Sequence, residues 1–267
     1  MPRTFEELDG TGSAFADVIE LRRIRALATT GEPLKIPTLF FALVLAVASP
    51  SNAAVIYGPT QIGSSARTSD YGSAAQFGFR TFDNFATSIN STVETLTWSG
   101  FWADFDNPIP AAAPAPDVQN WEIAFYADNG GSPGAQLSFE SFAAGAVTST
   151  FLGHGLFTTN DTYNVAIYRY SVALTNPFPV SGGTDYWFSV MSRSSSYYPA
   201  FVLFGATGGD DASFQQTLGA GLSVIDENVV SRDRAVVLEG TVPEPPATIL
   251  LAMAVLLLPL SRRLRRA

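Results

Sequence analysis

Cysteine is absent from the 267-residue chain, and histidine occurs once, as His154. Without cysteine the chain has no disulfide scaffold, no cysteine-ligated zinc or iron–sulfur site, and no thiol nucleophile. A single histidine also excludes any site that needs two imidazole groups. The fold must therefore be held together by packing, or with help from a metal bound to its acidic turns.

Positive charge is scarce as well. The chain has 15 lysine and arginine residues against 24 acidic residues, a formal net charge of -9, and Lys35 is the only lysine. Binding to nucleic acid or to an anionic membrane surface needs clustered positive charge, so we expect no nucleic-acid partner. The apolar fraction of 46% excludes a disordered chain.

The N-terminal region contains a ten-residue apolar run, residues 39–48, with Lys35 before it and small residues after it. A basic start, a short apolar stretch and a small-residue cleavage site are the three parts of a secretory signal peptide. Ten apolar residues are too few to span a bilayer, which needs about 20. The pattern predicts a signal helix within residues 34–53, export through the Sec translocon, and cleavage between Ala53 and Ala54.

Residues 1–33 precede this signal and are acidic and polar. They form either an extra leader or a mis-assigned start. We favour translation from Leu34, because leucine codons can serve as bacterial initiators and Leu34-Lys35 would then open a signal of ordinary length.

A second apolar run, residues 247–260, lies near the C-terminus. As a helix it would rise about 21 Å, less than the roughly 30 Å of the hydrocarbon core. Arginine side chains can reach the headgroups, and positive charge stays on the cytoplasmic side of the membrane. We therefore predict a single, weakly anchored transmembrane helix in the inner membrane. Its cytoplasmic basic end is formed by Arg262, Arg263, Arg265 and Arg266.

The residues Val242, Pro243, Glu244 and Pro245 stand directly before this helix. Together with the helix and the arginines they resemble the PEP-CTERM sorting signal of Gram-negative bacteria. The resemblance covers residues 242–267 and implies recognition by exosortase, an integral membrane cysteine protease or transpeptidase, with release to the cell surface or the extracellular polysaccharide matrix of a biofilm. Two prolines fix an extended backbone, which suits a protease groove. Pro246 and Pro259 depart from the pattern, and an ordinary stop-transfer anchor is the alternative.

Residues 54–241, the predicted extracytoplasmic domain, have the periodicity of strands. Residues 121–127 alternate large apolar residues with others and run into the turn signal of residues 128–134, which predicts a hairpin with residues 135–142. The other predicted strands are residues 77–85, 93–102, 163–172, 185–191, 200–204 and 235–239. Residues 107–116 are predicted to form an extended loop. The fold class is all-β, an antiparallel, jelly-roll-like β-sandwich.

The order of the central pieces also resembles the ectodomains of many PEP-CTERM proteins. The matching residues are Trp98 and Trp102, then Ile123, Phe125–Gly131, Pro133 and Gly134, then Pro177, Phe178, Val180, Gly183, Thr184, Tyr186 and Trp187. This similarity implies a β-sandwich and no particular activity.

The sequence offers little for catalysis. His154, between two glycines, is either a general base or, as we favour, a loop residue. Asp104 and Asp106 near Trp102 form a candidate glycosidase pair, although their place at a strand end favours solvated acids. We therefore expect a non-enzymatic protein without a cofactor, the alternative being a secreted glycan-active hydrolase.

Two binding hypotheses remain. Asp128, Asp210 and Asp211 stand at predicted turns, where carboxylates and carbonyls suit calcium, although their spacing fits no EF-hand loop. The alternative is an acidic, solvated rim. Exposed aromatic rings stack on sugars, and the candidates for this role are Tyr197, Tyr198 and Trp102. We expect structural, adhesive or exopolysaccharide-associated work at the cell surface.

Overall fold

The computed structural model describes residues 53–58, 61–103, 118–158, 162–196 and 199–243. The described residues form strands and two short 3-10 turns, Ala144–Ala146 and Ala220–Leu222. The strands are β1 (Ala54–Tyr57), β2 (Gln61–Thr68), β3 (Asp70–Gly72), β4 (Phe77–Ala86), β5 (Ser91–Ala103), β6 (Val118–Asp128), β7 (Pro133–Ala143), β8 (Thr148–Thr158), β9 (Thr162–Val180), β10 (Asp185–Ser194), β11 (Ala200–Thr207), β12 (Ala212–Leu218), β13 (Val224–Ser231) and β14 (Val236–Thr241).

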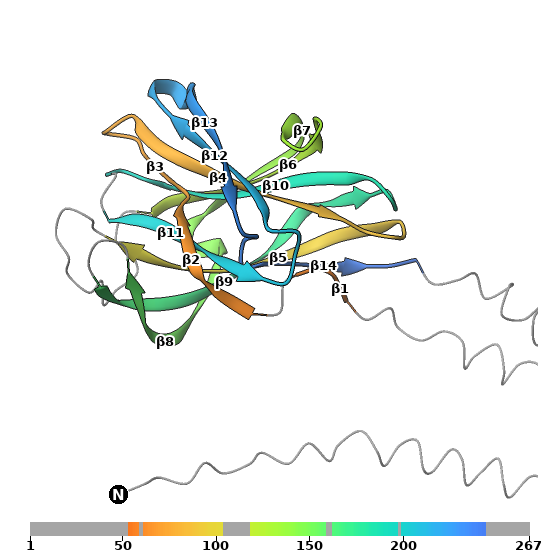
Figure 1. Cartoon of the computed structure of the whole chain (residues 1–267), viewed down its shortest axis with the longest axis horizontal. Helices are drawn as coiled ribbons and strands as arrows, with labels where there is room; N and C mark the ends of the chain where they lie inside the picture. Colours follow the sequence, from red (N-terminus) through yellow and green to blue (C-terminus); the bar gives the residue numbers. More distant parts are fainter. Residues whose placement is uncertain (1–52, 59–60, 104–117, 159–161, 197–198, 244–267) are drawn as a thin grey trace, which may run out of the picture. The chain divides into compact units, whose positions relative to one another are not determined.

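Sheet 1 is built around β5, which pairs with β9 along one edge and with two successive strands along the other (Figure 1). Thr92–Trp98 of β5 face β14, and Gly100–Ala103 face β11. A strand of 13 residues is long enough to hold both partners. Strand β8 extends the sheet beyond β9, β1 pairs with β14, and β2 pairs with β11.

Sheet 2 has the strand order β13-β12-β4-β3-β10-β6-β7. The short strand β3 lies between one end of β4 and one end of β10, and further along these two strands pair directly. The β3–β10 pair is parallel, whereas the other strand pairs among the described residues are antiparallel. The predicted antiparallel arrangement is therefore correct except at this pair.

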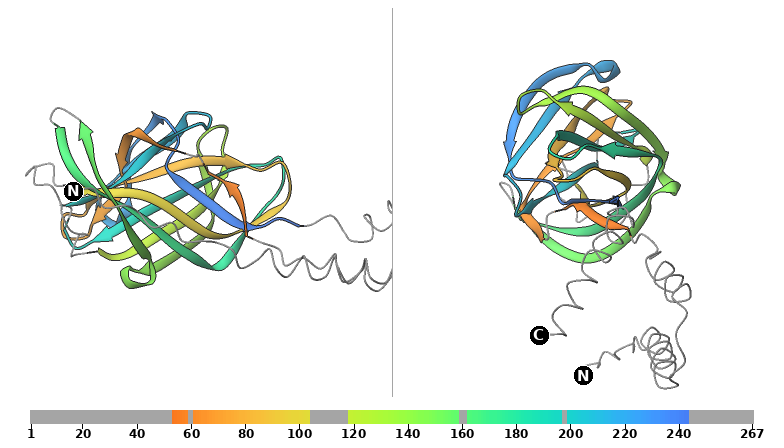
Figure 2. Two further views of the ribbon diagram at one scale, coloured as in Figure 1. Left: turned by 90° about the horizontal axis from the view of Figure 1, so that it is seen from below. Right: turned by 90° about the vertical axis from the view of Figure 1, so that its right-hand side faces the viewer.

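The two sheets face each other across a common core (Figure 2). That core is rich in aromatic rings. Trp98 of sheet 1 and Trp121 of sheet 2 lie with their ring centroids 5.2 Å apart, and Phe201 packs edge-on against Trp121 at 4.8 Å. Residues of a strand point alternately to its two faces, so Trp98 faces the core while Thr97 and Ser99 face outward. The fold is all-β, with two sheets packed over a common core.

Each predicted strand has a counterpart in the structure, namely β4, β5, β6, β7, β9, β10, β11 or β14. The hairpin of β6 and β7 is confirmed: the Asp128 carboxylate accepts hydrogen bonds from the Gly130 and Gly131 N–H groups, and both glycines have positive φ. Strands β1, β2, β3, β8, β12 and β13 have no counterpart among the predicted ones.

The predicted loop at 107–116 lies outside the described residues, as do the signal helix and the C-terminal helix. Within the described part of the chain, no helix has the length and apolar character that crossing a membrane requires.

Candidate functional site

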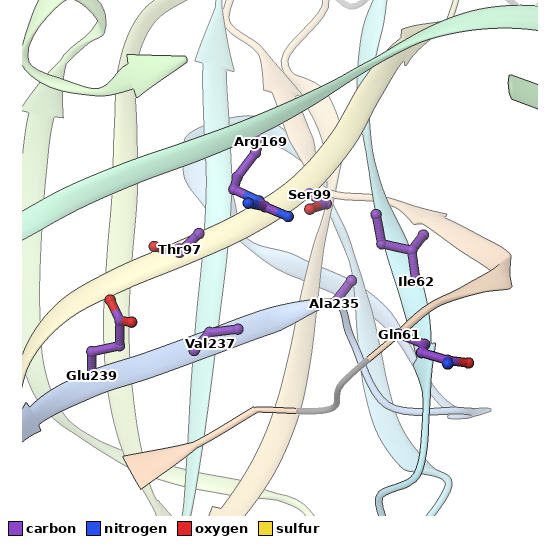
Figure 3. Close-up of a pocket in the computed structure, with 8 residues that line it drawn as sticks. All are labelled: Gln61, Ile62, Thr97, Ser99, Arg169, Ala235, Val237 and Glu239. Atoms are coloured by element: carbon purple, nitrogen blue, oxygen red, sulfur yellow. The ribbon is translucent and has the colours of Figure 1, made fainter. Parts of the chain in front are cut away.

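A groove lies on the outer face of sheet 1 (Figure 3). It has a volume of about 280 Å³. Strands β2, β5, β9 and β14, and Ala235 just before β14, contribute the lining residues Gln61, Ile62, Thr97, Ser99, Arg169, Ala235, Val237 and Glu239. We call this set the outer groove.

The side chains of the outer groove follow from strand alternation. On β9, Tyr170 is buried in the core, so its neighbour Arg169 points outward. On β14, Val236 and Leu238 are buried, so Val237 and Glu239 line the groove. The same pattern that builds the core therefore places polar groups on this face.

The outer groove holds one charge of each sign. In Figure 3 the Arg169 guanidinium points from β9 toward Ser99 on β5. Glu239 extends from β14, which pairs with the other edge of β5. Neither side chain makes an ion pair with any other described residue. The Thr97 hydroxyl donates to the Ser171 hydroxyl at 3.1 Å, which adds a polar pair beside the groove. Unpaired donors and acceptors of this kind suit the hydroxyl groups of a sugar chain.

The predicted aromatic platform is wrong for Trp102. This side chain is only 2% exposed, its ring packs against Trp121 and Phe201, and its Nε1–H donates to the Tyr170 hydroxyl at 3.0 Å. The alternation of side chains along β5 points Trp102 into the core. Tyr197 and Tyr198 lie outside the described residues, and none of the eight lining residues of the outer groove is aromatic.

Asp128 is placed at the exposed turn between β6 and β7, where the structure gives its carboxylate local partners. Besides the two glycine N–H groups, the Trp187 Nε1–H donates to it at 2.8 Å. These donors, the Trp187 indole first, hold the pKa of Asp128 below its usual value. This aspartate therefore closes a turn and fixes an indole.

Asp210 and Asp211 lie in the turn between β11 and β12, and they are not brought together with Asp128. In sheet 2 the strands β10 and β4 separate β6 from β12, which is three strand spacings, or about 14 Å. Asp128 therefore cannot share one cation with the other two. Across the described residues, no three acidic or histidine side chains converge closely enough to hold a metal ion among them.

The structure instead brings Asp210 next to Asp233, a residue without any sequence signal. The carboxyl groups of the two residues lie within hydrogen-bonding reach of each other. Asp83 on β4 is also fully buried in this region, and so is Arg234, whose backbone N–H donates to the Asp83 carboxylate. We call Asp83, Asp210 and Asp233 the aspartate cluster. A sequence pattern could not reveal it, because its members come from three distant parts of the chain.

The other candidates are His154, the pair Asp104 and Asp106, and the sorting motif, and the structure describes only some of these residues. His154 lies within strand β8, exposed and with its ring 5.1 Å from that of Phe151, so the expected loop position is wrong. Asp104 and Asp106 lie outside the described residues. Val242 and exposed Pro243 follow β14 directly, whereas Glu244, Pro245 and the four arginines lie outside the described residues.

In comparisons with known proteins, no protein-family model matches this chain, and no curated protein matches it.

Proposed function

We propose that this protein is an exported surface or matrix protein whose β-sandwich binds a polysaccharide. In this proposal a signal peptide ends at Ala53, and a Pro-Glu-Pro tail with a short transmembrane helix and terminal arginines is processed by exosortase. The sandwich is then released to the cell surface or the extracellular matrix. Its connections are jelly-roll-like, and its role is binding without catalysis.

The pairing of β1 with β14 supports the export part of the proposal. Strand β1 begins at Ala54, the first residue after the proposed cleavage, and β14 ends at Thr241, two residues before Pro243. Ala54 is the register partner of Gly240, so the first and last strands lie side by side in sheet 1 (Figure 1). Both segments proposed for removal therefore join the sandwich at its boundary, and cutting them would leave the described strands intact.

The outer groove is the observation that carries the binding part. It presents Arg169, Glu239 and Gln61 to solvent between the strands of sheet 1. Residues 54–242 contain six arginines against seventeen acidic residues, a net charge of -11. Such a surface repels polyanions, so we assign the groove to a neutral polysaccharide whose hydroxyl groups pair with the two charged side chains.

Processing of the tail is tested by mass spectrometry of the protein released from the cell surface. We expect a C-terminus close to Glu244 and no peptide from the arginine end. An intact peptide spanning Glu244 to Arg262 in the released protein would contradict exosortase processing.

Polysaccharide binding is tested by affinity electrophoresis of the purified domain in gels containing dextran, a neutral glucan, or alginate, a polyuronate. We expect retardation by the neutral polymer, weakened about tenfold in Arg169→Gln and in Glu239→Gln, because each loses a charge-assisted hydrogen bond. Glu227→Gln is the matched control, since Glu227 is an exposed acid on β13 in the other sheet. Equal retardation of all three variants would remove the outer groove from the proposal.

The alternative of a glycan hydrolase is separated by the double substitution Asp104→Asn and Asp106→Asn. Polysaccharide cleavage by the wild-type domain that disappears in this variant would favour the enzyme. Absence of cleavage by the wild type leaves the binding protein.

A further inference from the structure

Asp233 is a buried carboxylate with one backbone donor beside it, the Gly209 N–H, and no side-chain donor among the described residues. Its exposed fraction is 0%, and neither of its two carboxylate oxygens makes a hydrogen bond of good geometry. The turn before β12 lies directly on it: a Cβ added to Gly209 would be 1.9 Å from Asp233 Oδ2. Glycine at 209 therefore permits a close approach of backbone to carboxylate, a role that the exposed turn would not otherwise require.

Asp210 brings a second carboxylate to the same point. Its Oδ2 accepts a hydrogen bond from Asn84 Nδ2 at 2.6 Å, and its Oδ1 accepts one from the Ala212 N–H at 2.9 Å. The carboxyl group of Asp233 lies within hydrogen-bonding reach of it. Two ionised carboxylates have no donor to share, so a proton or a cation must lie between them.

The oxygens around this pair are also unsatisfied. Asn84 Oδ1 and Asp83 Oδ1 are buried without a hydrogen-bond partner. The other oxygen of Asp83 is already used, since it accepts from the Arg234 N–H at 2.8 Å and the Tyr57 hydroxyl at 3.1 Å. Buried polar atoms are nearly always paired in native proteins, so a group of orphaned oxygens indicates a bound partner, either water or a cation.

Arg234 does not supply that charge through contact. Its Nη2 donates to the Ser213 hydroxyl at 2.8 Å and to the carbonyl oxygens of Ser231 and Arg232 at 3.0 and 2.5 Å. No ion pair joins it to Asp83, Asp210 or Asp233 among the described residues. The Arg234 guanidinium thus acts on Asp83 and Asp233 through its charge alone, and its Nε and Nη1 are themselves buried without a partner.

We propose that Asp210 and Asp233 bind a calcium ion, with Asn84 Oδ1 as a third oxygen ligand and water completing the coordination. Calcium accepts carboxylate, amide and water oxygens in flexible geometry, whereas magnesium demands a near-ideal octahedron. Two carboxylates make a weak site, with a dissociation constant of about 0.1–1 mM, as in extracellular modules. All three protein ligands are described residues, and none of them belongs to the proposed sorting tail.

Burial and mutual proximity separate the pKa values of the two carboxyl groups. Burial, and then the neighbouring Asp210, raise the pKa of Asp233. At Asp210 burial acts to raise the pKa, but the Asn84 amide and the Ala212 N–H outweigh it and the pKa is lowered. A bound cation would relieve the repulsion between the pair, which links the β11–β12 turn to the segment between β13 and β14.

The test is thermal unfolding of the purified chain at pH 7.5, first with EDTA and then with 10 mM CaCl₂ or 10 mM MgCl₂. We expect calcium to raise the Tm by about 3–5 °C and magnesium by clearly less. Calorimetric titration with CaCl₂ should give one site per chain. No calcium-dependent change in Tm together with no heat of binding would overturn the proposal, and a proton would then hold the pair.

Variants assign the effect to the named residues. Asp210→Asn changes an exposed side chain and should fold, yet it should abolish the calcium-dependent rise in Tm. Asp233→Asn should do the same, and if it does not fold, Asp210→Asn alone decides. The matched control is Asp185→Asn, an exposed aspartate on β10, which should keep the full rise. A calcium response that survives Asp210→Asn would place the ion elsewhere and overturn the assignment.

Discussion

The aromatic core and the buried aspartates are both shielded from water, but burial affects the stability of the fold differently in the two. In the core, Trp98, Trp121 and Phe201 bury rings against rings and need little else than close packing. Asp70, Asp83 and Asp233 are each 0% exposed, and each carries a group whose charge is costly to bury. The core should therefore be indifferent to pH and ions, whereas the aspartates should make stability depend on both.

The largest effect is expected in the core. Trp121→Ala should lower the free energy of unfolding by about 3–5 kcal/mol, because it leaves a cavity between the rings of Trp98, Tyr170 and Phe201. Urea denaturation should give the same loss at pH 5 and at pH 8. Phe139→Ala on β7 is the control, with a loss below about 0.5 kcal/mol, since that ring is 45% exposed. A loss in Trp121→Ala that varies strongly with pH would break the contrast.

The second prediction concerns Asp70. Burial raises the pKa of Asp70 to about 7, against the opposing hydrogen bonds of Ser192 and Ser194 and the charge of Arg193. The folded state then holds its proton where the unfolded state has lost it. This contribution to stability is complete below about pH 4 and is lost as the pH rises to 7.

The size of that loss is roughly 4 kcal/mol at most, because one pKa unit is equivalent to about 1.4 kcal/mol. Urea denaturation at several pH values should show stability falling from pH 4 to 7, and Asp70→Asn should flatten the fall. Ser192 and Ser194 can still donate to the amide oxygen of that variant. An unchanged pH profile in Asp70→Asn would show that this carboxyl does not titrate as its burial implies.

A third prediction tests a buried charge that does have partners. Glu122 accepts from Arg80 Nη2 at 3.0 Å and from Arg193 Nη1 at 2.8 Å, with an exposed fraction of 8% for its side chain. Glu122→Gln should lower the free energy of unfolding by about 1–2 kcal/mol, since it leaves two partly exposed arginines without their shared anion. The loss, measured by urea denaturation, should shrink in 1 M NaCl. A neutral result would mean that solvent already screens the three charges.

The smallest effect is expected at the border of the two regions. Tyr57 packs its ring against Phe85 and Phe188 of the core while its hydroxyl donates to Asp83. Tyr57→Phe should cost about 1 kcal/mol, the net value of one hydrogen bond, and leave the packing intact. Tyr57→Ala should cost clearly more in the same denaturation assay. Equal costs for the two variants would show that the hydroxyl, rather than the ring, secures β1.

The strands at the centre of the sheets were predictable because their own residues carry the signal. The alternation of residues 121–127 and the turn at 128–134 define the β6–β7 hairpin locally. Strand β13 shows why others were missed: its burial pattern is exposed along almost its whole length, so no apolar alternation marks it. Strand β3 has three residues and owes its place to β4 and β10.

The candidate sites also contain some residues with a local sequence signal and others without one. Asp210 was a candidate from its turn, but Asp233 sits between two strands and has no turn signal around it. Arg169 and Glu239 are ordinary outward residues of β9 and β14, and only the pairing of both strands with β5 places them on one face of sheet 1. Trp102 was a candidate for sugar stacking and is a core residue, because aromatic composition does not say which face of a strand is covered.

The sequence by itself determined that the described chain is all-β, lacks disulfides and carries acidic charge, because strand periodicity, the absence of cysteine and the charge balance are properties of residues near one another or summed over the chain. Tertiary structure alone decided which aspartates meet, which tryptophans are buried and which strands border the outer groove. Those outcomes depend on contacts between residues such as Asp83, Asp210 and Asp233, which lie more than a hundred positions apart along the chain in two of the three pairs. Burial then changes their electrostatics, and burial is known only once both sheets are in place.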